Sequence, residues 1–296
     1  MPTTTANNLI LHYDEHGHPD DPPMLLVMGL GAQMTLWPIE LVEALSGHGF
    51  RVIRYDNRDI GLSQKFDGAK APGMVRHILM KRFGFSPRVP YTLSDMADDG
   101  MQLITNLGID KAHVVGASMG GMIAQLMAAN HGDRLLSLTS IFSTTGNPKI
   151  PAAEKHAMKA LTTRPSSMEE EALIEHGVMV SSAIGSPGYR PDPERQRERV
   201  RESIRRSVYP EGMVRQMAAI IDDGDRRERL KSVRVPTLVL HGEDDPLVKV
   251  EGGRDTAAAI PGAQLKTYKG WGHDLPMELV DPIAADIAHH AKAATG

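Results

Sequence analysis

Short apolar runs alternate with amphipathic stretches along most of the chain. This alternation predicts an α/β fold with a mostly parallel central sheet flanked by helices. Several runs are apolar throughout, as expected for strands that are buried on both faces. The predicted strands are residues 9–13, 24–28, 51–55, 113–115, 135–142, 237–240 and 264–268.

Between the predicted strands the sequence has helical periodicity. In residues 92–107, apolar and small side chains recur at intervals of three and four, which predicts one buried helical face. Ser94 is the predicted N-cap of that helix, and Gly108 is its predicted C-terminal cap. Residues 119–129 and 281–294 are two further predicted helices.

The alternation is interrupted between residues 144 and 231, where we predict no strand. We therefore expect residues 144–231 to form a helical cap, or lid, inserted into an α/β core made of residues 1–143 and 232–296. The helix-like pieces of this insertion are residues 152–161, 168–180, 193–208 and 211–221.

The composition excludes several kinds of protein. The chain has no Cys, which rules out disulfides, thiolate zinc sites, iron–sulfur clusters and a cysteine nucleophile. Its net charge of −4 disfavours nucleic acid as a partner. The longest apolar run, residues 24–30, is too short to span a bilayer, and residues 1–5 lack the features of a signal peptide. We expect a cytoplasmic protein without stable membrane insertion.

The segment Gly116-Ala117-Ser118-Met119-Gly120 lies between a β-branched run and an apolar stretch without proline. In a sharp strand-to-helix turn, this spacing lifts the Ser118 hydroxyl clear of the sheet, and the flanking glycines allow a close approach of strand and helix. The helix N-terminus then points backbone N–H groups at the same place, which favours a developing oxyanion. Ser118 is the predicted nucleophile. The alternative is a plain glycine-rich turn in which Ser118 is only an N-cap.

A serine hydroxyl needs a base before it becomes a good nucleophile. The chain has 13 His, and His273 lies in the loop between the last predicted strand and the last predicted helix. Loops at the carboxyl ends of parallel strands converge on one site. We therefore predict that His273 is the base.

The base needs a carboxylate that holds its tautomer and stabilises its positive charge. Asp245 follows the predicted strand 237–240, and Pro246 would stiffen the turn. Asp244 is the close rival, and Glu243 a weaker one. The resulting order along the chain, Ser118 then Asp245 then His273, is the order of α/β-hydrolases.

Four segments carry a resemblance to that superfamily. Residues 26–31, 52–63, 113–120 and 272–276 resemble the corresponding parts of the aclacinomycin methylesterase family of α/β-hydrolases. The resemblance covers nearly the whole chain. It implies a carboxylic ester hydrolase with an α/β-hydrolase fold.

The same resemblance implies roles for individual residues. It makes Ser118, Asp245 and His273 the triad, and it implies an oxyanion hole formed by the backbone N–H groups of Leu30 and Met119. The sequence departs from the family at the first oxyanion loop, which reads Met-Gly at residues 28–29 where His-Gly is common. This change removes a side chain that often braces that loop.

Several functions fit the same triad. A carbon–carbon bond hydrolase, a lactonase and a cofactor-free perhydrolase are alternatives to a serine carboxylesterase that acts through an acyl-enzyme on esters such as methyl esters of bulky acids. A non-enzymatic alternative is a ligand-binding protein that has the hydrolase fold. The expected partner is a small-molecule ester. We expect no cofactor and no metal, and we interpret His12, His16 and His18 as a solvated turn rather than a metal site.

Two charged segments have competing interpretations. We predict that Asp56 and Arg58 pair in a turn that braces the oxyanion loop, the alternative being a substrate-binding Arg. Residues 194–206 contain six Arg, and three of these stand three residues after a Glu. This spacing favours a self-paired, solvated helical face over an anion-binding patch.

Several methionines and the apolar segment 68–90 are candidates for lining a substrate pocket. The chain has 17 Met. Several fall on the proposed site loops and cap, either as core residues or as an adaptable pocket for a bulky acyl group. Residues 68–90 are expected to line the pocket entrance, with a membrane-surface helix as the alternative. The methionines concerned are Met34, Met119, Met122, Met158, Met179, Met213 and Met217.

Overall fold

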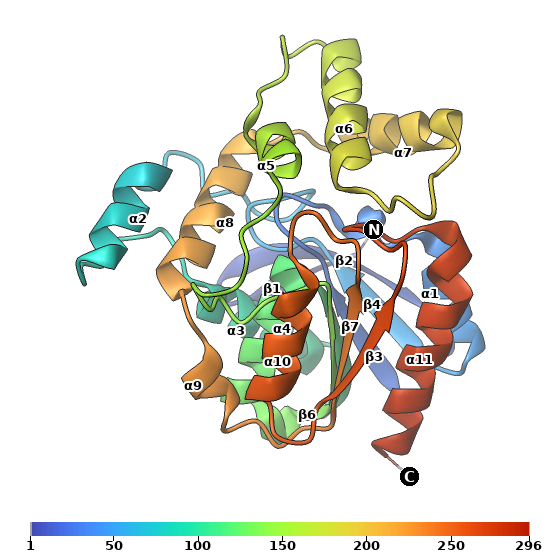
Figure 1. Ribbon diagram of the computed structural model, residues 1–296. Coiled ribbons are helices and arrows are strands. Elements are labelled where there is room, and N and C mark those ends of the chain that lie inside the picture. The colour runs from blue at the N-terminus through green and yellow to red at the C-terminus, as the bar shows by residue number, and fades with distance from the viewer. Residues whose placement is uncertain (1, 296) are drawn as a thin grey trace.

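The computed structural model describes residues 2–295, and its centre is one eight-stranded sheet (Figure 1). The strand order is β1-β2-β4-β3-β5-β6-β7-β8. The first two pairings, β1 with β2 and β2 with β4, are antiparallel, and the others are parallel, which confirms the predicted α/β fold. The strands are β1 (Thr3–Ala6), β2 (Leu9–His16), β3 (Pro23–Val27), β4 (Arg51–Tyr55), β5 (Ala112–Ala117), β6 (Leu135–Ile141), β7 (Thr237–Gly242) and β8 (Gln264–Tyr268).

The central strands are apolar throughout because both faces of the sheet are covered. In β3, Leu25 and Val27 pack into one hydrophobic core, whereas Met24 and Leu26 pack into a second core on the opposite face. Successive strand residues point to opposite faces, so each face needs its own apolar set. The sheet therefore forms the middle of three layers.

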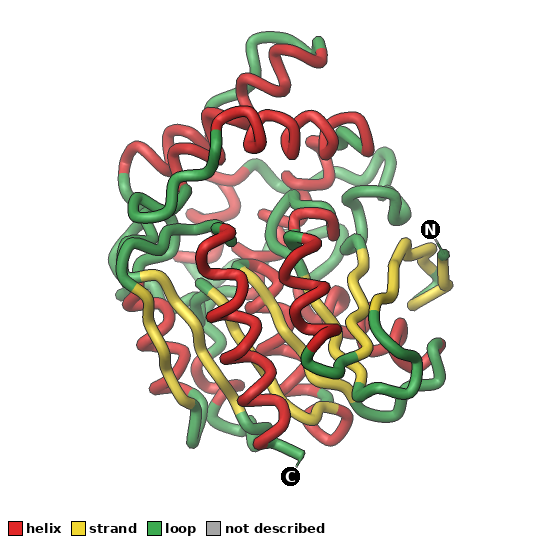
Figure 2. Tube along the Cα trace, turned by 90° about the vertical axis from the view of Figure 1, so that its right-hand side faces the viewer, coloured by secondary structure: helices red, strands yellow, loops and turns green. Residues whose placement is uncertain are grey.

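The outer layers are helices (Figures 1 and 2). One face carries α1 and α11, which pack against each other, and the other carries α3, α4, α9 and α10. These helices are α1 (Ile39–Gly47), α3 (Leu93–Asn106), α4 (Met119–Asn130), α9 (Arg227–Leu230), α10 (Val250–Ala259) and α11 (Val280–Ala293). Short 3-10 turns occur at Met34–Leu36, Gly132–Arg134 and Met277–Leu279.

Helix α3 begins differently from the prediction. Its N-cap is Thr92 rather than Ser94, since the Thr92 hydroxyl accepts a hydrogen bond from the backbone N–H of Asp95. The Asp95 carboxylate in turn accepts from the Thr92 backbone N–H, which completes a capping box. The predicted cap at the other end is confirmed, because Gly108 has a φ of +73°.

Helices of the insertion lie over one end of the sheet (Figures 1 and 2). All of residues 144–231 are described, and they contain no strand, as predicted. Their separation from the core as a cap stays a prediction. The four larger helices are α5 (Lys155–Thr162), α6 (Glu170–Ile184), α7 (Pro193–Arg206) and α8 (Pro210–Asp223), and α8 packs against α2 (Met74–Arg82).

Two buried ion pairs join the insertion to the loop after β4. Arg206 at the end of α7 lies 2.7 Å from Asp56, and Arg215 on α8 makes two hydrogen bonds of 2.5 and 2.9 Å with Asp59. Both carboxylates are completely buried. Burial alone would raise the pKa of Asp59, but hydrogen bonds led by those from Arg215 lower it overall.

The arginines of α7 are mostly not self-paired. Arg201 does pair with Glu198 one turn earlier, as the spacing predicts. In contrast, Arg197 and Arg205 pair with two glutamates of the neighbouring α6, Glu171 and Glu170. The predicted self-pairing of this face is therefore mostly wrong, because α6 and α7 lie side by side and arginines of α7 pair with glutamates of α6. Within residues 2–295, no helix is long and apolar enough to cross a bilayer.

Candidate active site

Ser118 occupies the sharp turn between β5 and α4. Its φ of +57° and ψ of −120° are unusual for a residue with a side chain, and such strain persists only where the surroundings hold it. The Ser118 N–H donates to the carbonyl of Ile141 at 3.0 Å, and the Ser143 hydroxyl donates to the Ser118 carbonyl at 2.7 Å. The end of β6 and the residues after it therefore fix the turn.

The glycines on either side of Ser118 are required by close packing. A Cβ atom on Gly116 would lie 2.2 Å from the carbonyl oxygen of Gly120. A Cβ atom on Gly120 would lie 2.0 Å from the carbonyl oxygen of Val27. Neither contact is tolerable, and backbone atoms cannot yield as a flexible side chain can. The spacing of the two glycines thus permits α4 to start directly against β5 and β3.

His273 connects Ser118 with Asp245. Its Nε2 atom lies 2.9 Å from Ser118 Oγ, and its Nδ1 atom lies 2.7 Å from Asp245 Oδ2. A carboxylate only accepts, so Nδ1 carries a proton and donates it to Asp245. Nε2 of a neutral imidazole is then free to accept the Ser118 hydroxyl proton. His273 is nearly buried and Ser118 is half-buried.

Asp245, rather than its acidic neighbours, is the carboxylate that reaches the imidazole. Its other oxygen accepts two backbone hydrogen bonds, from Leu247 at 2.8 Å and from Val248 at 2.9 Å. Asp244 points elsewhere and accepts from the Gly270 N–H at 2.7 Å. The turn after β7 therefore aims one of three consecutive acids at His273 and leaves the others near the surface.

A second histidine lies close to Asp245 without competing for it. His241 Nε2 is 3.7 Å from Asp245 Oδ2 but only 2.7 Å from the carbonyl oxygen of Val248. The shorter contact identifies the carbonyl as the acceptor of the Nε2 proton. Burial lowers the pKa of His241, which keeps the ring neutral. His241 therefore does not compete with His273 for a hydrogen bond to Asp245.

The loop that carries His273 is bonded to the end of α6. The His273 N–H donates to the carbonyl of Ile184 at 2.8 Å. Ser186 hydrogen-bonds the carboxylate of Asp274, and its hydroxyl oxygen accepts from the Gly272 N–H at 2.9 Å. Burial raises the pKa of Asp274, and the hydrogen bonds from Ser186 oppose that shift. The insertion therefore helps to place the imidazole.

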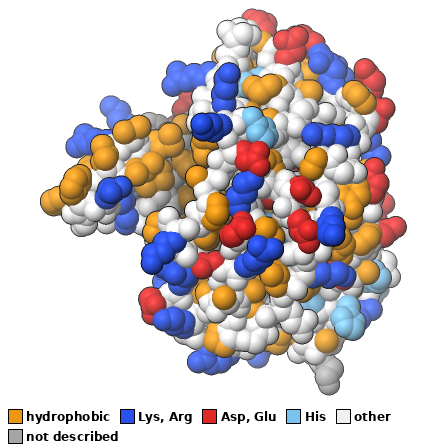
Figure 3. Space-filling view, in the orientation of Figure 1, with side chains coloured by type: hydrophobic (Ala, Val, Ile, Leu, Met, Phe, Trp, Pro, Cys, Tyr) orange, Lys and Arg blue, Asp and Glu red, His pale blue; other side chains and the backbone are white. Residues whose placement is uncertain are grey.

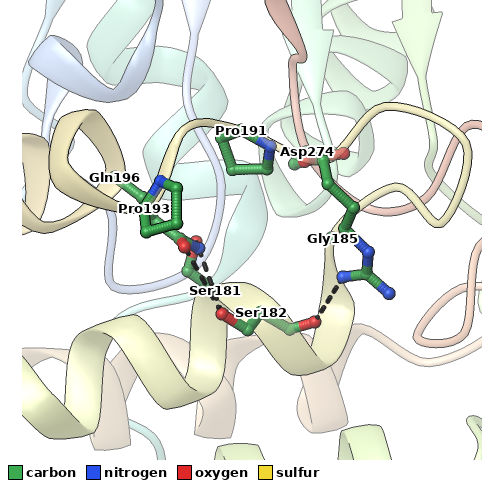
Figure 4. Close-up of a pocket in the computed structure, with 8 residues that line it drawn as sticks. Ser181, Ser182, Gly185, Pro191, Pro193, Gln196 and Asp274 are labelled. Carbon is green, nitrogen blue, oxygen red and sulfur yellow. Dashed lines mark hydrogen bonds between the residues drawn. The ribbon is translucent and has the colours of Figure 1, made fainter.

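Beside this junction is a pocket of about 220 Å³ (Figure 4). Asp274 forms part of its wall, and so does Gln196 of α7, which donates to the hydroxyl of Ser181 on α6 at 2.8 Å. The pocket thus lies between the ends of two insertion helices and the loop of His273. Its other lining residues are Ser182, Gly185, Arg190, Pro191 and Pro193.

Both predicted oxyanion donors belong to segments that lie next to Ser118. Met119 is the first residue of α4, where a backbone N–H has no acceptor within the helix. On the other side, Gly29 approaches so closely that a Cβ atom there would lie 3.1 Å from Ser118 Cβ. Leu30 follows directly. The loop of Leu30 and the start of α4 therefore flank the serine.

The loop of Leu30 is braced by polar side chains. Asn57 donates to the Met28 carbonyl at 2.8 Å, and Asp56 accepts from the Met34 N–H at 2.8 Å. Asp56 does brace the loop, but the predicted Asp56–Arg58 pair is wrong. Arg58 instead makes two hydrogen bonds, of 2.6 and 2.7 Å, with the buried carboxylate of Asp99 on α3, and a third, of 3.1 Å, with the Asp95 carbonyl.

Gln216 is a bracing residue that sequence reasoning missed. It is completely buried on α8, accepts from the Gly31 N–H at 2.9 Å and donates to the Arg58 carbonyl at 2.9 Å. The sequence holds no signal for this role, since a lone glutamine in a helix-like stretch predicts no partner. Gln216 therefore ties α8 to the loop of Leu30 and to the segment after β4.

Gln216→Ala is expected to lower kcat/KM for an ester by about tenfold to a hundredfold, because a displaced oxyanion donor aligns poorly with the developing charge. Steady-state kinetics measure this effect. Gln102→Ala, which removes a glutamine of α3 that bonds Asn106 at 2.8 Å on the surface, is the matched control and should retain most activity. Equal kcat/KM values for the two variants would show that Gln216 has no positioning role.

The methionines named in the sequence analysis differ in burial and in location. Met119 and Met122 belong to the core under α4, and Met34 is fully buried. Met213 of α8 packs over Gly31, whose added Cβ atom would lie 3.1 Å from Met213 Cγ. Met158 and Met179 are exposed. Met213 is thereby placed against the predicted oxyanion loop, and Met217 is half-buried on the same helix.

No cluster of three or more His, Asp or Glu side chains suited to a metal ion occurs within residues 2–295. The polar cluster near the N-terminus instead makes ion pairs. His16 lies 3.4 Å from Asp14, which also pairs with Arg54, while the exposed His18 lies 3.7 Å from Asp20.

Known proteins share this architecture. Rhodomycin D methylesterase DnrP of Streptomyces peucetius is 30% identical over 100% of both chains. The crystal structure of the enol-lactonase from Burkholderia xenovorans has a TM-score of 0.72, with 26% identity over 98% of this chain and 100% of that one.

A third similarity concerns the fold alone. The meta-cleavage product hydrolase CumD of Pseudomonas fluorescens has a TM-score of 0.78 at 19% identity, covering 99% of this chain and 98% of that one. A family model described as the alpha/beta hydrolase fold matches residues 22–278, which is most of the chain. The chain belongs to the α/β-hydrolase fold family.

Proposed function

We propose that this protein is a serine carboxylesterase that hydrolyses methyl esters of bulky organic acids through an acyl-enzyme intermediate. The coarser assignment, a carboxylic ester hydrolase, follows from its family and from its full-length similarity to rhodomycin D methylesterases. The observation that carries the finer proposal is the hydrogen-bonded chain from Ser118 through His273 to Asp245.

In the first half-reaction, Ser118 Oγ attacks the ester carbonyl carbon while His273 Nε2 accepts the hydroxyl proton. Asp245 stabilises the resulting imidazolium through its hydrogen bond to Nδ1. The tetrahedral intermediate then collapses, the carbon–oxygen bond to the alcohol breaks, and His273 returns the proton to the leaving oxygen. The products are an alcohol, methanol for a methyl ester, and an acyl-Ser118.

In the second half-reaction, water takes the place of the alcohol. His273 accepts a proton from the water as its oxygen attacks the acyl carbon, and the proton then passes to Ser118 Oγ as the acid leaves. The backbone N–H groups of Leu30 and Met119 stabilise the oxyanion in both halves. Such donors act strongly because they are already oriented before the charge develops.

Hydrolysis of a lactone is the second candidate function. It is favoured by the similarity to the enol-lactonase, which reaches 26% identity over nearly the whole of both chains. A lactone is a cyclic ester, so the same attack opens the ring and leaves the alcohol attached to the acyl chain. Carbon–carbon bond hydrolysis and perhydrolysis also fit the three side chains, but no comparable observation favours them.

An alkyl p-nitrophenyl phosphonate tests the proposed nucleophile directly. We expect release of one equivalent of p-nitrophenol and a phosphonyl mass increase on the peptide that contains Ser118. Protein unfolded in denaturant is the control and should not react, because its serine has no base. An unmodified Ser118 in the folded protein would refute the acyl-enzyme scheme and favour a binding protein on a hydrolase scaffold. Parallel assays with a bulky methyl ester and a lactone separate the two hydrolase candidates.

A further inference from the structure

Helix α2 and the turn after it form an exposed apolar surface, here called the α2 surface. Among residues 2–295, sixteen large apolar side chains are exposed, and six of them fall in the short stretch from 74 to 85. Phe83 is 73% exposed and Phe85 is 64% exposed. Figure 3 shows these hydrophobic side chains gathered on the lobe that projects at the left. The six are Met74, Val75, Ile78, Leu79, Phe83 and Phe85.

The orientation of α2 is the reverse of that of an ordinary surface helix. A surface helix normally turns its apolar side to the protein and its charged side to water. In α2, the side against α8 carries His77, which is completely buried 3.7 Å from Asp222. Lys81 on the same side donates to the Asp222 carbonyl at 2.7 Å. The apolar residues are consequently left outside, although burying them against α8 would have been favourable.

The α2 surface is also basic. Residues 68–90 contain five Lys and Arg but no Asp or Glu, in a chain whose net charge is −4. Arg76, Arg82 and Arg88 are exposed beside the apolar side chains. The remaining two cations are Lys70 and Lys81.

From this combination we infer that the α2 surface docks on an anionic lipid bilayer. Exposed apolar side chains enter the boundary between headgroups and acyl chains, while arginines at the same level pair with lipid phosphates. A second copy of the chain fits less well, because a symmetric contact would bring two sets of cations together without any acid from the segment. The surface binds reversibly, since the helix is far too short to span the membrane.

The full-length protein should therefore co-sediment with vesicles that contain phosphatidylglycerol in phosphatidylcholine. We expect at least about tenfold weaker binding to vesicles of phosphatidylcholine alone, and weaker binding to the anionic vesicles as salt is raised. If the protein did not bind the anionic vesicles at low salt, the inference would be overturned.

Two double variants test the two components of the surface. Phe83→Ser/Phe85→Ser removes apolar side chains from the turn, and Arg76→Glu/Arg82→Glu reverses two exposed charges. Each should weaken binding to the anionic vesicles by about tenfold or more. Thermal unfolding checks that each variant is folded.

Matched controls lie elsewhere on the surface. Met168→Ser removes an exposed apolar side chain, and Lys111→Glu/Lys149→Glu reverses two exposed charges. These controls should bind vesicles like the natural protein. Equal binding by the α2 variants and the controls would overturn the inference. So would a dimer in solution that Phe83→Ser/Phe85→Ser dissociates, because the surface would then be an interface between two copies. Ester hydrolysis is not measured, so these outcomes are independent of the proposed function.

Discussion

Ser118→Ala is expected to lower kcat for an ester by about 10⁶-fold, which is the scale of losing the nucleophile of a serine hydrolase. The variant keeps the turn, since the hydrogen bonds that fix residue 118 use its backbone N–H and carbonyl. It removes only the oxygen that lies 2.9 Å from His273 Nε2. Steady-state hydrolysis of a bulky methyl ester, with a detection limit low enough to record the residual rate, measures the effect.

Ser94→Ala is the matched control for this variant. Ser94 lies on the first turn of α3, outside the hydrogen-bonded chain of Ser118, His273 and Asp245, and does not cap the helix. We expect it to retain activity and to unfold at nearly the same temperature as the natural protein. Turnover by Ser118→Ala within tenfold of the control would mean that another group, or water activated directly, performs the attack.

Asp245→Asn is expected to lower kcat by about 10⁴-fold through the tautomer of His273. The backbone N–H groups of Leu247 and Val248 donate to Oδ1, so they hold the amide oxygen of an asparagine in that position. The amide nitrogen must then face His273 Nδ1, where the aspartate oxygen lies now. A donor there forces the ring proton onto Nε2, which can no longer accept from Ser118.

The neighbouring Asp244 provides a control of the same chemistry. Asp244→Asn keeps an oxygen that can accept from the Gly270 N–H, and the residue is exposed. Its activity should stay within a fewfold of the natural protein. Kinetic assays of the two variants at several pH values compare them directly. A similar loss in both variants would indicate general disturbance of the turn rather than a specific role of Asp245.

The sheet was predictable because burial leaves a strong signal in sequence. Seven of the eight strands were predicted, and the five from β3 to β7 are almost entirely buried. For β4 and β8 the predicted limits agree with the observed ones. The strand missed, Thr3–Ala6, lies at the edge of the sheet and is mostly polar, so no apolar pattern marks it. Its antiparallel pairing with β2 comes from backbone hydrogen bonds, which a sequence does not display.

The N-cap of α3 was missed for a different reason. Thr92 and Ser94 both have a hydroxyl suited to capping, and local propensity does not choose between them. The structure favours Thr92 because Asp95 stands three residues later and completes a reciprocal pair of bonds. The spacing was present in the sequence, so this feature could have been found.

Long-range ion pairs could not be predicted. Spacing along α7 suggested partners within the helix, whereas Arg197 and Arg205 pair with α6 and Arg206 pairs with Asp56. The spacing of charged residues in a sequence indicates only pairs that are close along the chain. Arg206 and Asp56 are 150 residues apart. The pairing of Arg58 with Asp99 escaped prediction in the same way.

The candidate site was easier to predict than these pairs. Ser118, His273 and Asp245 each follow or precede a recognisable strand, and the topology of a parallel sheet brings such positions together. The structure brings the three side chains within hydrogen-bond distance, and their catalytic roles stay a prediction. Which of Asp244 and Asp245 faces the imidazole depends on the local turn, and only the coordinates show it.

The pairs of Asp56 with Arg206 and of Asp59 with Arg215 limit how freely this fold can be recombined. A chimera that grafts the insertion of a relative onto this sheet must supply a cation at each position, or two fully buried carboxylates lose their cationic partners. Removing one member of a buried pair typically costs about 3–5 kcal/mol. The insertion is therefore not an interchangeable module, since its two arginines and the two carboxylates of the loop after β4 must be kept together.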